Sequence, residues 1–132
     1  MLCRSMHSIS DEDFSALISR AMDELPQEYI RGLDNVVITY DDEPSPEQRQ
    51  EMKLKQYESL FGLYQGVPLT KRGAGYNLVL PDKITIFKLP MLQATHDEVS
   101  LYAQVKHTLW HEIAHYYGLD HDRIHEIERH WQ

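Results

Sequence analysis

The chain has 132 residues, which suits one domain and is too short for two. Its net charge of −8, with no cluster of lysine and arginine, argues against nucleic acid and an anionic membrane surface as partners. Cys3 is the only cysteine, so an intramolecular disulfide and a cysteine-rich zinc site are excluded. Residues 1–9 are expected to be a frayed N-terminus. Because the chain shows neither a signal peptide nor a long apolar run, we expect a cytoplasmic protein.

The N-terminal part predicts a helix followed by a strand. Ser10 and Asp13 resemble a capping box, and apolar residues then recur at helical spacing until Pro26. Residues 36–40 have the sequence Val-Val-Ile-Thr-Tyr, which is β-branched and apolar throughout. Such a run is typical of a strand covered on both faces, so we expect it at the centre of a sheet.

The middle of the chain predicts a polar helix and further strands. A Ser-Pro-Glu start predicts the helix over residues 46–61, and Gly62 is expected to end it. Residues 63–69 and 76–80 are interpreted as further strands, the first of them irregular. Residues 83–88 alternate, with two isoleucines on one face and threonine and phenylalanine on the other. This alternation favours an outer strand over a fully buried one.

The C-terminal part predicts a long helix and a short closing helix. Thr95 with Glu98 makes a second capping box, and the helix that it opens is expected to run to His115. Apolar residues within 124–131 predict a final short helix packed on the core.

The long helix carries the motif H-E-x-x-H-x-x-G-x-x-H. Residues one helical turn apart share a face, so His111 and His115 can present two imidazoles to one zinc ion. Gly118 can end the helix in a left-handed conformation, which turns the chain so that His121 supplies a third ligand. Glu112 points about 100° away from His111 around the helix and is predicted to be the general base. We expect one zinc ion per chain.

A chance occurrence of histidines on a solvated helix is the alternative to a metal site. The helical context argues against chance, because a stripe of apolar residues lies opposite the histidines when about 100° is assigned to each residue. The stripe consists of Tyr102, Val105, Leu109, Ile113 and Tyr116. This side is expected to face the core, and the histidines are expected to face a cleft.

With these residues in view, the chain resembles the minimal zincins, a family of small bacterial metallopeptidase-like proteins. Besides the motif, residues 62–69 and 80–87 are similar to recurrent segments of that family. The resemblance implies a single α+β domain over residues 1–132, in which a small mixed sheet packs against two or three helices. It also implies a zinc-dependent peptidase in which the third ligand position varies and is often acidic. Here that position holds His121, followed by Asp122. The motif spacing is also similar to that of the metzincins, but no methionine follows it to form their methionine turn.

The predicted reaction is peptide-bond hydrolysis by a metal-activated water, with Glu112 accepting the proton of that water. A peptide or protein substrate is expected to lie extended along residues 83–88 and add a strand to the sheet. Arg72, Tyr64 and Tyr76 are candidates for stabilising the oxyanion, and their alternative role is packing.

Other polar residues near the motif carry open alternatives. His107 is expected to be a rim histidine, and its alternatives are to support a ligand or to join the ligand set. Asp120, Asp122 and Glu126 are each candidates to accept a hydrogen bond from a ligand imidazole. The other histidines are expected to be solvated.

Two rival functions are compatible with the motif. A metal-dependent ribonuclease shows three histidines at this spacing, but it has glycine where Glu112 stands, and the acidic charge of this chain also disfavours it. A non-catalytic zinc domain that binds a protein partner is the second alternative, because a chain of 132 residues has few walls for a specificity pocket.

Overall fold

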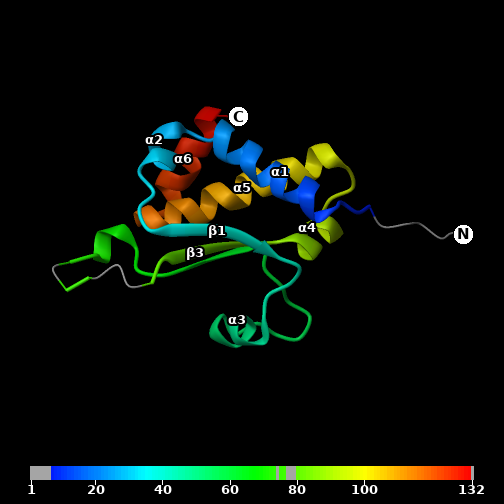
Figure 1. Ribbon diagram of the computed structural model, residues 1–132, viewed down its shortest axis with the longest axis horizontal. Coiled ribbons are helices and arrows are strands. Elements are labelled where there is room, and N and C mark those ends of the chain that lie inside the picture. The colour runs from blue at the N-terminus through cyan, green and yellow to red at the C-terminus, as the bar shows by residue number, and fades with distance from the viewer. Residues whose placement is uncertain (1–6, 74, 77–79, 132) are drawn as a thin grey trace, which may run out of the picture.

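Helices α1 and α5 cover one face of a three-stranded sheet in the computed structural model, which describes residues 7–73, 75–76 and 80–131 (Figure 1). In chain order the elements are α1 (Asp11–Glu24), α2 (Gln27–Arg31), β1 (Val36–Asp41), α3 (Pro46–Glu51), β2 (Gly62–Gln65), the 3-10 helix η1 (Leu69–Lys71), β3 (Asp82–Phe87), α4 (Lys88–Ala94), α5 (Glu98–Tyr117) and α6 (His121–Trp131). The expected α+β class is confirmed. Within the described ranges, no helix combines the length and the apolar character that a membrane span needs.

The sheet has the order β1-β3-β2, which corrects the prediction for two strands. Strand β3 lies at the centre, where it pairs in parallel with β1 and antiparallel with β2. Residues 36–40, expected at the centre, form an edge strand, in which Val37 is 46% exposed. The prediction of an outer strand for β3 was wrong because both faces of this strand are covered. Ile84 and Ile86 pack in the main core, while Thr85 on the other face is also fully buried.

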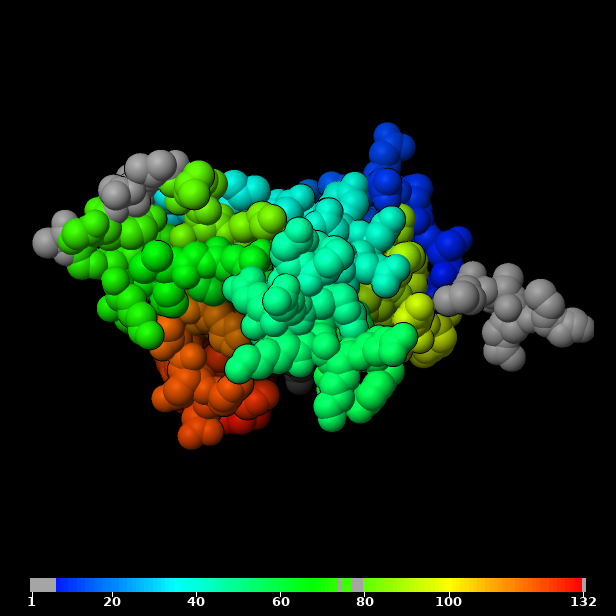
Figure 2. All heavy atoms as spheres, turned by 90° about the horizontal axis from the view of Figure 1, so that it is seen from below, coloured from blue at the N-terminus to red at the C-terminus, as the bar shows by residue number. Residues whose placement is uncertain are grey.

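The second face of the sheet lies on the side of α3 and the segments that flank it (Figure 1). A capping box between Ser45 and Gln48 begins α3, as the Ser-Pro pair predicts. The helix ends at Glu51, well before the expected end at residue 61, and Lys53 then adopts a positive φ of 56°. This polar sequence has no apolar stripe to bury, and helices in proteins are stabilised mainly by such packing. Seen from below, the segment around residues 40–60 covers the middle of the molecule (Figure 2).

The segment after α3 also differs from the prediction. Gly62 begins β2 instead of ending a helix, and the strand ends at Gln65, so the strand predicted over residues 63–69 is only partly present. Residues 69–71 form η1. The strand predicted over residues 76–80 cannot be compared, because residues 77–79 lie outside the described ones.

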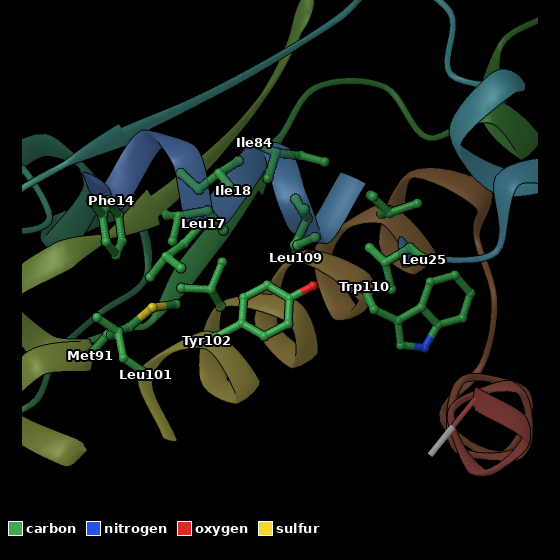
Figure 3. Packing of buried hydrophobic residues seen from close by; sticks show 14 of the residues in the cluster. Phe14, Leu17, Ile18, Leu25, Ile84, Met91, Leu101, Tyr102, Leu109 and Trp110 are labelled. Carbon is green, nitrogen blue, oxygen red and sulfur yellow. The ribbon is translucent and has the colours of Figure 1, made fainter. Parts of the chain in front are cut away.

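The main core lies between the sheet and the helices α1 and α5. Ser10 caps α1 by accepting a hydrogen bond from the Asp13 backbone N–H at 3.1 Å, as predicted. The apolar face of α1 then points at α5 and the sheet (Figure 3). The core side chains labelled there are Phe14, Leu17, Ile18, Leu25, Ile84, Met91, Leu101, Tyr102, Leu109 and Trp110. Of the expected frayed N-terminus, residues 1–6 are not described, whereas Ile9 packs against this core.

Helix α5 begins two residues later than expected and ends at Tyr117, two residues beyond the expected His115. Its N-cap is Asp97, in a capping box with Ser100, whereas Thr95 donates a hydrogen bond to the Met91 carbonyl. Asp97 accepts the first-turn N–H more readily than the predicted Thr95 because a carboxylate is a stronger acceptor at a helix N-terminus. Gly118 closes the helix with a left-handed φ of 74°. The predicted closing helix is confirmed as α6, which buries Ile124.

Candidate metal centre

Helix α5 brings three residues of the motif together on one side. The ring centres of His111 and His115 lie 4.5 Å apart, at an interplanar angle of 72°. Possible ligand atoms of these two residues and of Glu112 all lie within 4.8 Å of one another. In the described part of the chain this is the one group of three such residues that meets this spacing.

The opposite side of α5 holds the helix in place. All five residues of the expected apolar stripe are buried, so the predicted orientation of the helix is correct: Tyr102, Val105, Leu109, Ile113 and Tyr116. Trp110 adds a link to α6 by donating its indole N–H to the Ile124 carbonyl at 3.2 Å. The histidine face is therefore fixed by burial of the other face, and α6 is fixed against the same helix.

The electrostatics of the site favour a neutral imidazole at one position. Burial, and then the charge of His115, lower the pKa of His111 below its ordinary value. A hydrogen bond with Glu112 raises the pKa of His115, whose Nδ1 lies 3.3 Å from a Glu112 carboxylate oxygen. The Glu112 side chain is only 10% exposed, whereas that of His115 is 42% exposed. A metal ion binds the neutral imidazole and not the imidazolium. The lowered pKa of His111 therefore favours the form that binds a metal ion at neutral pH.

His121 lies beside this group but is not part of it. It is the first residue of α6 and is exposed to solvent. Its ring centre lies 5.9 Å from that of His111. The expected helper carboxylates Asp120 and Glu126 have other partners: Asp120 accepts from the Arg123 backbone N–H, and Glu126 pairs with the Arg123 side chain. The ligand role of His121 stays a prediction.

The residues present fit a zinc ion by donor type and spacing. Two imidazoles that share a tetrahedral zinc ion, with Zn–N distances of about 2.0–2.1 Å, have ring centres roughly 5 Å apart. The observed separations of 4.5 Å for His111 and His115 and 5.9 Å for His111 and His121 lie on either side of that value. Nitrogen ligands with a carboxylate nearby are typical of a catalytic zinc site.

A cleft of about 400 Å³ leads to these residues, between the start of β2 and α5. It is lined by Leu60, Phe61, Gly62, Gln104, His107, Thr108, His111 and Glu112. Gly62 allows the close approach of strand and helix, because a Cβ atom there would lie 2.6 Å from Thr108 Cγ2 and 3.4 Å from Glu112 Cγ. A larger hollow of about 680 Å³ beside Gly66 has no motif residue in its walls. Glu112, the predicted general base, therefore lies in the wall of the smaller cleft.

The three candidates for the oxyanion stabiliser do not line this cleft. Arg72, whose side chain is 6% exposed, forms an ion pair with buried Asp82 at 2.7 Å. Tyr64 donates its hydroxyl to the same carboxylate at 2.5 Å, and burial together with this bond raises the pKa of Tyr64. The Tyr76 ring lies 4.6 Å from the Arg72 guanidinium. These side chains connect the loop after β2 to the sheet, which is the alternative role expected of them.

One pair at the cleft has only a partial signal in the sequence. His107 lines the cleft, as expected of a rim histidine, and its Nδ1 bonds to the carboxylate of Glu128 on α6. Nothing in the motif points to Glu128, which lies 21 residues away along the chain. Only the packing of α6 against α5 brings the two together.

A sequence profile of zincin-like metallopeptidases matches residues 33–131, which include the three strands, α5 and α6. The chain belongs to this family. A conserved hypothetical protein from T. thermophilus has the same fold, with a TM-score of 0.54 and 24% sequence identity. The similarity covers 80% of this chain and 92% of that one. No curated protein matches the chain. The resemblance to the minimal zincins is thus confirmed at the level of the family.

Proposed function

We propose that this zincin-like protein is a zinc-dependent metallopeptidase. His111, His115 and His121 would hold one zinc ion, and Glu112 would act as the general base. The observation that carries the proposal is the convergence of His111, Glu112 and His115 at one cleft. Family membership supports the same assignment.

The chain's own residues supply the proton transfer. When bound, zinc polarises the scissile carbonyl and makes water more acidic. Glu112 is buried in the cleft wall, where its carboxylate can accept a proton from the attacking water and pass it to the leaving amine. His115, hydrogen-bonded to Glu112, orients that carboxylate.

Strand β2 is the proposed docking edge for the substrate. Strand β3 was expected to take this role, but it lies at the centre of the sheet with both edges paired. Strand β2 lies at an edge of the sheet, and its first residue, Gly62, lines the cleft. An extended peptide beside β2 would add a strand and carry a carbonyl past Glu112.

The decisive experiment compares the wild type with Glu112→Gln at equal zinc content, using a proteome-derived peptide library. We expect Glu112→Gln to keep zinc and fold but to lose at least about a hundredfold in cleavage rate, because general bases typically contribute 10²–10⁴-fold. Undiminished cleavage by the variant would remove Glu112 from the mechanism. Peptide binding without cleavage in either protein would indicate a non-catalytic binding domain, and cleavage of an RNA control would indicate a ribonuclease.

Zinc content tests the ligand set separately. The wild type should hold about one zinc ion per chain by elemental mass spectrometry, and the double substitution of His111 and His115 by alanine should hold none. His121→Ala should weaken zinc binding, whereas His121→Asp should retain it because a carboxylate is also a zinc ligand. Unchanged affinity in both His121 variants would show that this residue is not a ligand.

A further inference from the structure

A carboxylate and a histidine from different helices meet at the edge of the cleft. The Nδ1 atom of His107 on α5 hydrogen-bonds to a carboxylate oxygen of Glu128 on α6. The Glu128 side chain is 9% exposed, whereas the His107 side chain is 46% exposed. The pair is therefore buried at its acidic end and open at its imidazole end.

Stability alone explains this arrangement poorly. Removing a carboxylate from water is costly, and a buried pair often gives no net stabilisation over an apolar pair of similar size. Helices α5 and α6 are already joined by the hydrogen bond from Trp110 and by the buried side chains of Ile124 and Ile127. The Glu128 carboxylate instead fixes the orientation of the His107 ring.

The bond also determines which nitrogen is free. An ionised carboxylate only accepts hydrogen bonds, so the hydrogen of the His107 ring is held at Nδ1. Nε2 then remains for a partner outside the protein core. Within the described residues, Nδ1 is the nitrogen of His107 that has a hydrogen-bond partner, and Nε2 has none.

The His107 side chain lies where two hollows meet. Its ring centre is 6.4 Å from that of His111, and both residues line the cleft with Glu112. His107 and Gln104 also line a neighbouring hollow of about 690 Å³ along the first half of α5. An extended chain that leaves the cleft for this hollow must pass His107.

We propose that His107 contacts the main chain of a bound peptide through Nε2, and that Glu128 is the positioning residue that holds the ring for this contact. The proposal rests on the function proposed above, since it takes the ligand of the cleft to be an extended peptide. With its hydrogen held at Nδ1, the His107 ring offers Nε2 as an acceptor, so the group that it contacts is a backbone N–H of the peptide.

The test compares two substitutions, each of which replaces a different ring nitrogen of His107 with a polar atom of an amide. The amide of His107→Gln places a polar atom near the position of Nε2, whereas the amide of His107→Asn places one near Nδ1. We expect His107→Asn and His107→Ala to lower kcat/KM on the peptide library about three- to tenfold, the usual effect of one hydrogen bond, and His107→Gln to retain most of it. Zinc content should be equal in all variants.

Glu128→Gln tests the positioning role. It should lower kcat/KM in the protein with His107 but cause no further loss in the His107→Gln protein, because the ring that it orients is then absent. A purely structural pair predicts the reverse order, in which Asn substitutes better than Gln because it preserves the contact with Glu128. That order, or equal kcat/KM in all His107 variants while the wild type cleaves, would overturn the proposal and leave the peptidase assignment standing.

Binding separates the two proposals if the wild type does not cleave. The same library is offered to the zinc-loaded Glu112→Gln protein with and without His107→Asn. If peptides bind only when His107 is present, the contact is supported although the catalytic function fails. If no peptide is cleaved or bound, both proposals fail.

Discussion

Replacing Gly62 by alanine tests whether the close approach of β2 to α5 shapes the cleft. The new Cβ atom would lie 2.6 Å from Thr108 Cγ2 and 3.2 Å from the Thr85 carbonyl oxygen. Carbon atoms normally meet at about 3.5–4.0 Å, so the Thr108 side chain, the strand or the helix must shift by roughly 1 Å. Overpacking of this kind typically costs about 1–3 kcal/mol. The shift occurs beside Glu112, so activity should fall further than stability alone explains.

The assay is chemical denaturation together with peptide cleavage at a temperature where all variants are folded. Thr108→Ser removes the methyl group that lies nearest the new Cβ, and it serves as the matched control. We expect the double variant to recover at least half of the unfolding free energy that Gly62→Ala loses, since the Thr85 carbonyl contact remains. An unfolding free energy for Gly62→Ala within about 0.5 kcal/mol of the wild type would refute the argument.

Three further substitutions, one of them with a matched control, test the fold around the site. Leu109→Ala, in the fully buried core, should lose about 2–5 kcal/mol in denaturant unfolding, whereas Gln104→Ala on the histidine side of α5 should lose far less; equal losses would mean that the helix faces are misassigned. Asp82→Asn should lower the unfolding free energy by up to about 3–5 kcal/mol because it removes the close ion pair of the buried Arg72 guanidinium and leaves the longer one with exposed Asp34 at 3.9 Å, and a change below about 1 kcal/mol would contradict this role. Gly118→Ala should lower the melting temperature, because its φ of 74° is strained for alanine, and an unchanged melting temperature would contradict this reason.

The motif helix was predictable because its information is local. His111, Glu112 and His115 lie within five residues, and α-helical geometry alone brings their side chains together. The apolar stripe on the other side then determines which face is buried. Gly118 was predictable for a similar reason, since only a residue without a side chain adopts its left-handed turn at no cost.

The order of the strands depended on contacts that the chain makes over long distances. Residues 36–40 have the composition of a central strand but lie at an edge, while β3 has the alternation of an outer strand but is covered on both faces. The alternation of apolar and polar residues in a strand indicates which of its two faces is the more apolar. It does not report which segments cover the second face, and here the segments around α3 do so.

The partners of the polar residues were decided by the tertiary structure alone. Arg72 and Asp82 are ten residues apart, and His107 and Glu128 are 21 apart, with no periodicity to connect either pair. Local geometry determined the residues of α5 that can hold a metal ion. Packing of α6 and the sheet decided what surrounds them, because a side chain's partners depend on which segments fold against it, and that is a property of the whole chain.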